Sequence, residues 1–315
     1  MSANEPASRY ATCLICDGNE WITVREGRDL CRPECRKVFN LSRCASCGHV
    51  MQNPAPDERE LNAAYSVSGA YIVYRPAWKE HGWPVWKILR NWTTRRRISR
   101  LRRYAKGREL LEVGCGAGDF LAAAHEVGWN ARAVEYNGIL ADQIRRELGF
   151  DVRTGALAIG QWKQDEFDAV AFWNVLEHLS EPLQDLSIAA HSLRRGGRVL
   201  LNIPSRQAAE RGQWFGSHWA ILDLPRHLNF YDEAALSRLC GRAGLDLIVY
   251  KTPFVQSAWC YYMSCWLWAN QERKKRLRWV WFAALSATVT LTLPFVAFES
   301  LRKHGLEAFA VAEKR

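Results

Sequence analysis

The segment ELLEVGCGAGDF, residues 109–120, decides the fold of this chain. Apolar residues lead into three glycines at alternate positions, Gly114, Gly116 and Gly118, and a helical pattern follows over residues 120–127. Glycine permits a tight turn and lets a ligand approach the backbone closely. The segment therefore predicts the first strand, glycine loop and helix of an open α/β sheet that binds a nucleotide-like ligand.

A second strand, ARAVEYN at residues 131–137, contains Glu135 about twenty residues after the loop. A carboxylate at this position can accept hydrogen bonds from both hydroxyl groups of a ribose. Nicotinamide-binding folds share this arrangement, so it does not decide the ligand alone. The glycine spacing, however, is G-x-G-x-G and not the G-x-G-x-x-G of dinucleotide sites.

Two later segments narrow the choice of fold. FDAVAFWNVLEHLSEPLQDL, residues 167–186, looks like a fourth strand with its helix, and LRRGGRVLLNIP, residues 193–204, like a turn and a fifth strand. Together with the glycine loop, the chain from about residue 109 onward resembles the class I S-adenosylmethionine (SAM)-dependent methyltransferases of type 23 or 11. The resemblance implies an α/β, Rossmann-like sheet of seven strands in the order 3-2-1-4-5-7-6, and SAM as the cofactor.

The resemblance also implies roles for particular residues. The glycines would pass under the methionine part of SAM, with Glu112 near its amino group, and Glu135 would hold the ribose. The remaining cofactor contacts would come from Tyr136 beside the adenine, Ala156 at the adenine edge and Asn174 on the methionine side.

Two histidines are expected on the acceptor side as catalytic residues. His178 follows the fourth strand, and His227 lies in LPRHLNF after the fifth. An unshifted imidazole titrates near neutrality, as a general base requires. Structural roles remain open for both, and Arg226 could bind an acidic substrate group or a neighbouring carboxylate. The nearby residues Trp214, His218 and Trp219 are expected to form part of a lid.

The N-terminal residues 10–53 form a cysteine-rich module resembling a zinc ribbon. Two C-x-x-C pairs are expected to bind Zn²⁺ as a tetrahedral set: Cys13, Cys16, Cys44 and Cys47. Metal binding would supply most of the folding energy of so small a segment. Three further residues could join or replace these ligands: Cys31, Cys35 and His49.

Residues 54–107 are interpreted as a linker with basic, aromatic helices, in which residues 83–107 form either an ordinary solvated helix or one that touches a membrane. The methyltransferase core is predicted to comprise residues 108–251 and 305–315. Residues 252–304 form an apolar insertion before the last strand, EAFAVAEK at 307–314.

The insertion contains twenty uncharged residues, 279–298, which is long enough to span a bilayer. The strands on either side of it belong to one sheet, so a single crossing would remove the last strand from that sheet. Basic residues flank the stretch, and Pro294 can break a helix. We therefore expect a monotopic or re-entrant membrane hairpin, with a lid or a dimer surface as the alternative.

The net charge of +10 suits an anionic partner such as lipid headgroups or nucleic acid. Because no N-terminal signal peptide is recognised, we expect a cytoplasmic protein at the inner face of the membrane. The expected function is SAM-dependent methylation of a small, lipid-linked or glycan-linked, amphipathic acceptor. The alternatives are an RNA methyltransferase, with the zinc module and basic helix holding phosphates, and a non-enzymatic cofactor-binding module.

Overall fold

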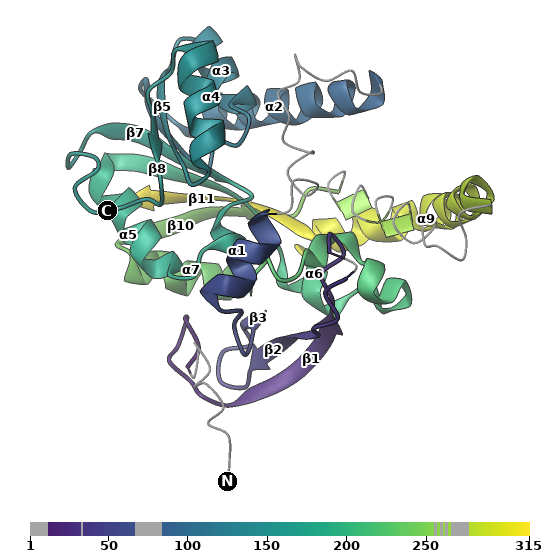
Figure 1. Ribbon diagram of the computed structural model, residues 1–315. Helices are drawn as coiled ribbons and strands as arrows, with labels where there is room; N and C mark the ends of the chain where they lie inside the picture. Colours follow the sequence, from purple (N-terminus) through teal and green to yellow (C-terminus); the bar gives the residue numbers. More distant parts are fainter. Residues whose placement is uncertain are drawn as a thin grey trace.

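The structure is a computed structural model that describes residues 12–32, 34–66, 84–254, 257–258, 261, 264–265 and 277–315. Its centre is a seven-stranded sheet with the order β10-β11-β8-β7-β4-β5-β6 (Figure 1). In that order the strands are Leu245–Lys251, Glu307–Lys314, Leu193–Pro204, Phe167–Trp173, Glu109–Val113, Asn130–Glu135 and Val152–Thr154. When the seven strands are numbered in chain order and read from β6 to β10, the order is 3-2-1-4-5-7-6. The predicted fold is therefore confirmed.

Helices cover both faces of this sheet (Figure 1). On one face, α2 (Pro84–Tyr104), α3 (Asp119–Glu126) and α4 (Gly138–Leu148) bury Leu101, Phe120 and Ile144 among strand residues. On the other face, α5 (Pro182–Ser192) and α7 (Glu233–Arg242) bury Leu186 and Leu239. The near-continuous apolar strands β4 and β7 are buried because both of their faces are covered.

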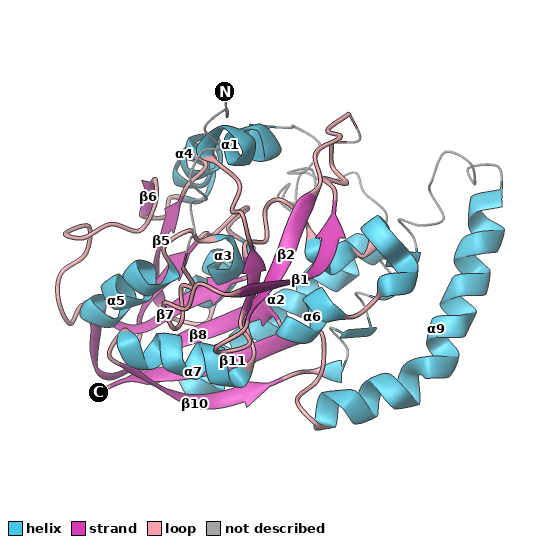
Figure 2. Cartoon of the chain, turned by 90° about the horizontal axis from the view of Figure 1, so that it is seen from below, coloured by secondary structure: helices cyan, strands magenta, loops and turns pink. Residues whose placement is uncertain are grey.

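The last strand, β11, runs antiparallel between β8 and β10, and Glu307 is paired with Pro204 at the end of β8. The chain therefore enters β11 at the carboxyl ends of the parallel strands, which is the edge where such sheets bind ligands. Directly before β11 lies the helix α9 (Arg278–Leu301), which projects away from the sheet (Figures 1 and 2).

The helix α9 corrects one expectation. Pro294 lies inside α9 and does not end it, and the chain continues helically to Leu301. Figure 2 shows that this helix is bent, and helices that contain an internal proline commonly bend. The predicted return of the chain within residues 279–298 is therefore wrong. In the part of the chain that the structure describes, no helix combines the length and apolarity needed to cross a membrane.

The cysteine-rich segment forms part of a second, four-stranded sheet with the order β1-β2-β3-β9. These strands are Trp21–Gly27, Phe39–Cys44, Val50–Gln52 and Asn229–Phe230. The last of them belongs to the methyltransferase core, so β3 and β9 join the two parts of the chain. Short helices complete the fold: α1 (Glu58–Ser66), α6 (Arg206–Glu210) and the 3₁₀ turns η2 (Leu176–His178), η3 (Gln213–His218) and η4 (Ala220–Leu222).

Candidate active site and cysteine cluster

The glycine loop follows β4 and adopts a backbone that requires glycine. Gly114, Gly116 and Gly118 have φ angles of 69°, 55° and 80°, in the left-handed region that other residues rarely adopt. A Cβ atom on Gly114 would lie 2.7 Å from Cγ2 of Val175, in the turn after β7. The loop therefore packs directly against that turn, which places the predicted cofactor side and acceptor side next to each other.

Two buried carboxylates flank the loop. Glu135, at the end of β5, accepts hydrogen bonds from the backbone N–H groups of Gly116 (2.8 Å) and Asn137 (2.9 Å). Burial raises the pKa of Glu135, and it raises the pKa of Glu112 well above its usual range. Oε2 of Glu112 makes no hydrogen bond within the described residues. A buried, unpaired acceptor beside a glycine cradle fits the ammonium group of SAM, and Glu135 is positioned for its ribose.

The predicted adenine contacts lie at the rim of the site. Tyr136 follows β5 and is 69% exposed, and Ala156 is exposed in the loop after β6. Two further apolar side chains, Ile139 and Ile159, are exposed in the neighbouring segments after the same two strands. The exposed ring of Tyr136 and the two exposed isoleucine side chains offer an apolar surface on which the adenine of SAM can pack.

Asn174 directly follows β7 and has a φ of 60°, an uncommon conformation for a residue with a side chain. Its Oδ1 accepts hydrogen bonds from Nδ2 of Asn202 (3.1 Å) and Nη2 of Arg97 (3.4 Å). The Arg97 guanidinium also lies over the ring of Trp173 and lowers the pKa of Glu112 against the larger, opposite effect of burial. Arg97 is a site residue that the sequence analysis missed, because its arginine-rich helix was assigned to solvent or membrane.

The structure brings the two predicted catalytic histidines together, with ring centroids 4.7 Å apart. Nδ1 of His178 lies 3.0 Å from the carbonyl oxygen of Arg226 and 3.1 Å from the hydroxyl of Tyr65. Nδ1 of His227 donates to the carbonyl oxygen of Ile221 at 2.8 Å. Burial lowers the pKa of His178 to about 3 and also lowers that of His227. Both imidazoles are therefore neutral, and they are weaker bases than the unshifted histidines assumed for general base catalysis.

Glu177 is a second residue that the sequence analysis missed. It is fully buried in the turn η2, and its Oε1 lies 4.0 Å from Nε2 of His227. Burial raises the pKa of Glu177 to about 8. Oδ2 of Asp223 approaches the same nitrogen to 3.9 Å. The motif LEH pointed only to its histidine, since nothing in the sequence indicates that the preceding glutamate faces inward.

Arg226 binds protein carboxylates. Its guanidinium contacts both carboxylate oxygens of Asp223, and Nη1 lies 3.5 Å from Oδ1 of Asp29. Trp219 is fully buried, and its indole N–H donates to the carbonyl oxygen of Ala208, so it is a core residue and the lid expected for it is wrong. The side chains of Trp214 and His218 lie outside the described residues.

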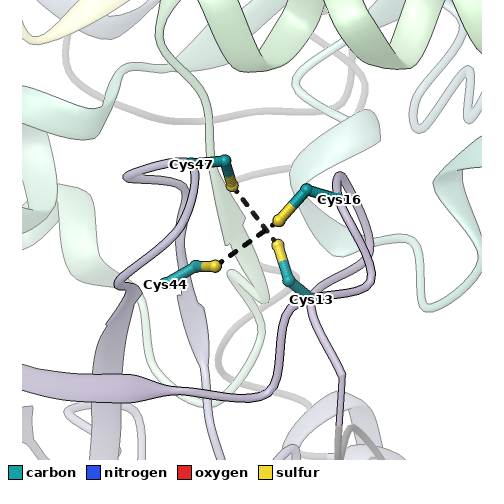
Figure 3. Close-up of side chains that lie close together, drawn as sticks. All are labelled: Cys13, Cys16, Cys44 and Cys47. Carbon is teal, nitrogen blue, oxygen red and sulfur yellow. Dashed lines mark hydrogen bonds between the residues drawn. The ribbon is translucent and has the colours of Figure 1, made fainter.

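The four cysteines predicted to bind zinc converge on one point (Figure 3). Their Sγ atoms all lie within 4.8 Å of one another, with Cys13 and Cys47 3.6 Å apart and Cys16 and Cys44 also 3.6 Å apart. Four thiolates in such a cluster are the donor set of a structural Zn²⁺ site, so the residues present fit this metal. Zinc bound there would hold the two knuckles together and would take no part in methyl transfer.

The further residues considered as ligands lie outside this cluster. Among the described residues, the cysteine cluster does not include Cys31, Cys35 or His49. Sγ of Cys31 accepts a hydrogen bond from Arg226 at 3.2 Å, and His49 is buried with Nε2 3.2 Å from Oδ1 of Asn229.

Residues 89–250 match the family model described as a methyltransferase domain. The match spans just over half of the chain, and it covers the glycine loop, Glu135 and the two histidines. The chain belongs to this methyltransferase family, and its fold is that of the class I SAM-dependent enzymes.

Curated relatives support this assignment. The chain is 28% identical over 152 residues to the ubiquinone biosynthesis O-methyltransferase of Methylococcus capsulatus, covering 45% of this chain and 64% of that protein. It is 28% identical over 149 residues to a probable SAM-dependent methyltransferase of Mycolicibacterium smegmatis, covering 47% of this chain and 56% of that protein. The chain thus matches less than two thirds of the length of these relatives.

Solved structures share the fold. The cyclase SpnF superposes with a TM-score of 0.52 at 18% identity, covering 82% of this chain and 97% of that one. A geranyl diphosphate methyltransferase in complex with SAM superposes with a TM-score of 0.50 at 14% identity, covering 76% and 94%. At this level of identity the likeness concerns the fold alone.

Proposed function

We propose that this protein transfers a methyl group from SAM to a hydroxyl group of an amphipathic acceptor, lipid-linked or glycan-linked, at a membrane surface. SAM supplies a methyl group on a sulfonium, which is already an excellent leaving group. The glycine loop, Glu112 and Glu135 bind and orient the cofactor at the carboxyl ends of β4 and β5. The acceptor would be held on the other side of the loop, beside His178 and His227.

The observation that carries the membrane part of this proposal is the exposed apolar surface of α9. Among its described side chains, seven large apolar ones are exposed: Trp279, Val280, Trp281, Leu291, Phe295, Phe298 and Leu301. Leu291 and Leu301 are 84% and 85% exposed. Large apolar side chains exposed together in this number mark an interaction site.

Charge favours a membrane as the occupant of this surface. Basic residues flank the helix, in ERKKRLR at 272–278 and in Arg302 and Lys303 after it, and the whole chain carries a net charge of +10. Tryptophan and arginine at the ends of an apolar helix suit the headgroup region of an anionic bilayer. The C-terminal end of α9 is tied to the sheet edge that holds the site, because Thr252 donates to the carbonyl oxygen of Ser300 at 3.0 Å.

The RNA alternative has less support from the basic helix. Three arginines of α2 face the core: Arg90 pairs with Asp119, Arg97 lies over Trp173, and Arg100 lies over Phe309 at 4.2 Å. These guanidinium groups are therefore engaged and do not form a phosphate-binding stripe.

Vesicle flotation tests the membrane part. The full chain should float with phosphatidylglycerol vesicles, and a Leu291→Ser/Phe295→Ser variant should stay in the soluble fraction. Ile248→Ser, on the exposed edge strand β10, is the matched control and should float like the unchanged protein. Lipid-independent dimers that the double variant abolishes would instead assign the surface to a second copy of the chain and overturn the membrane proposal.

The chemistry is tested separately with methyl-labelled SAM and a membrane extract. Label should enter the organic phase as an alkali-stable ether in the presence of the protein. Tight SAM binding with label found only in RNA would overturn the proposed acceptor.

A further inference from the structure

We propose that Glu177, His178 and His227 form a binding site for a divalent metal ion on the acceptor side of the active site. One ligand atom from each residue lies within 4.8 Å of the others. Two imidazoles and one carboxylate are a donor set that binds Zn²⁺, Mn²⁺ or Fe²⁺ in proteins. This inference deepens the proposed function and depends on it for the role of the metal, but not for its binding.

The hydrogen bonds of both histidines prepare them as ligands. Nδ1 of His178 faces the carbonyl oxygen of Arg226, and Nδ1 of His227 faces that of Ile221. A carbonyl oxygen accepts and cannot donate, so each Nδ1 carries the proton. Each Nε2 therefore keeps a free lone pair, and the bond at Nδ1 fixes the orientation of the ring, as in metal-bound histidines.

The carboxylate of Glu177 provides independent evidence for a ligand. The residue is fully buried, and neither Oε1 nor Oε2 makes a hydrogen bond of ordinary geometry within the described part of the chain. Burial has the largest effect on the pKa of Glu177, and the side chain of Asn174 is close enough to lower that pKa by a smaller amount. A buried carboxylate without partners is costly, and a cation between it and the two imidazoles would satisfy it. His227, with 12% of its side chain exposed, leaves the site open on one side.

The surrounding charges are compatible with a cation. Arg226 lies close to the cluster, but Asp223 and Asp29 bind its guanidinium. Asp223 also places Oδ2 3.9 Å from Nε2 of His227, so a carboxylate group borders the site together with this guanidinium. Two hydrogen bonds hold the halves of the site together. The backbone N–H of Leu228 donates to the carbonyl oxygen of Glu177 at 2.7 Å, and the side-chain amide of Asn229 donates to the carbonyl oxygen of Leu179 at 3.2 Å.

The position of the cluster indicates what the metal would do. Glu177 lies three residues after Asn174, in the turn that packs against the glycine loop at Val175. A hydroxyl group bound to the cation would lose its proton more readily. The proton leaves to water, the hydroxyl oxygen forms a bond to the methyl carbon, and the carbon–sulfur bond of the sulfonium breaks, with its electron pair going to sulfur.

Mn²⁺ is the probe for this site, because thiolates select Zn²⁺ and keep Mn²⁺ out of the cysteine cluster. Zinc-loaded full-length protein is titrated with Mn²⁺, and bound ion is followed by electron paramagnetic resonance. We expect one Mn²⁺ per chain, with pulsed spectra showing coupling to imidazole nitrogen. Glu177→Gln should weaken binding at least about tenfold, and His227→Gln should remove part of the nitrogen coupling. Glu181→Gln, an exposed carboxylate four residues away, is the matched control and should bind normally.

Absence of bound Mn²⁺ in the unchanged protein, or equal weakening by Glu181→Gln, would overturn the metal site. Thermal unfolding of each variant checks that it is folded. The first of these outcomes is measured on the unchanged protein, so it does not depend on the folding of any variant. Calorimetry with SAM distinguishes this failure from a failure of the proposed function. A protein that binds SAM but not Mn²⁺ refutes only the metal, and one that binds Mn²⁺ but not SAM refutes only the methyl transfer.

Discussion

The side-chain amide of Gln52 donates a hydrogen bond of 2.7 Å to the carbonyl oxygen of His227. The same nitrogen lies 2.9 Å from the carbonyl oxygen of Pro225, and the backbone N–H of Gln52 donates to Leu228. One residue of the cysteine-rich module thus holds the backbone on both sides of a histidine of the candidate active site. The module is part of the structure that positions the site.

We expect Gln52→Ala to destabilise the protein, because two backbone carbonyl groups lose their donor in a buried environment. The free energy of unfolding in urea should fall by about 1–3 kcal/mol. Thr23→Ala, at an exposed position of the same small sheet, serves as the control and should have little effect. Affinity for SAM should not change in either variant, since Gln52 contacts no residue assigned to the cofactor. A Gln52→Ala protein as stable as the control would show that this link contributes nothing.

Glu135 is expected to bind the ribose of SAM. Glu135→Gln should weaken SAM binding in calorimetry by about 1.5–3 kcal/mol, the usual contribution of hydrogen bonds to a charged group. Glu126→Gln, an exposed residue at the end of α3, should bind SAM normally. Unchanged affinity of the Glu135 variant would mean that the ribose lies elsewhere.

The cysteine cluster predicts a defined zinc content in the protein. Elemental analysis of Cys44→Ser/Cys47→Ser should show one zinc fewer per chain than the unchanged protein, together with a lower temperature of unfolding. Cys31→Ser should retain the full zinc content, because Cys31 lies outside the cluster and contacts Arg226. Loss of zinc from the Cys31 variant would instead make this residue a ligand.

Asp185, in α5, predicts a pH dependence of stability. Burial, with a smaller effect of Glu181, raises its pKa from 3.8 to about 7. Between about pH 4 and pH 7 the folded protein therefore holds a proton that the unfolded chain has released, and this contribution to stability is lost as the pH rises through that range. Asp185→Asn removes the effect, so its stability relative to the unchanged protein should increase from pH 4 to pH 7.

The size of this change has an upper limit set by the shift, about 4 kcal/mol, and partial exposure reduces it to about 1–3 kcal/mol. Urea unfolding at several pH values measures it. A constant difference between the two proteins across this range would show that Asp185 ionises normally in the fold.

Much of the fold was predictable from local patterns. The glycines at 114, 116 and 118 need positive φ angles, and that requirement is visible in the sequence itself. The alternating segment at residues 307–314 identified the last strand with its observed bounds. Both features are properties of a few consecutive residues, and they sufficed because the order of elements in this fold is shared by the family.

The contacts that complete the site are long-range, and the sequence did not indicate them. Arg97 reaches Asn174 only because α2 packs beside α3, and Arg226 meets Asp29 only because β3 pairs with β9. Glu177 is buried because the chain folds over it through Leu228. At Pro294 a local pattern was misleading. Proline was expected to end the helix, but α9 continues through Pro294 to Leu301.

The insertion of β11 between β8 and β10 has a consequence for how the protein is made. Neither neighbour can complete its hydrogen bonds until residues 307–314 have been synthesised, and α9 leaves the ribosome before them. For that interval an unfinished sheet and a long apolar helix are exposed together. Early docking of α9 on a membrane would shield that surface and hold the growing chain where the sheet then closes.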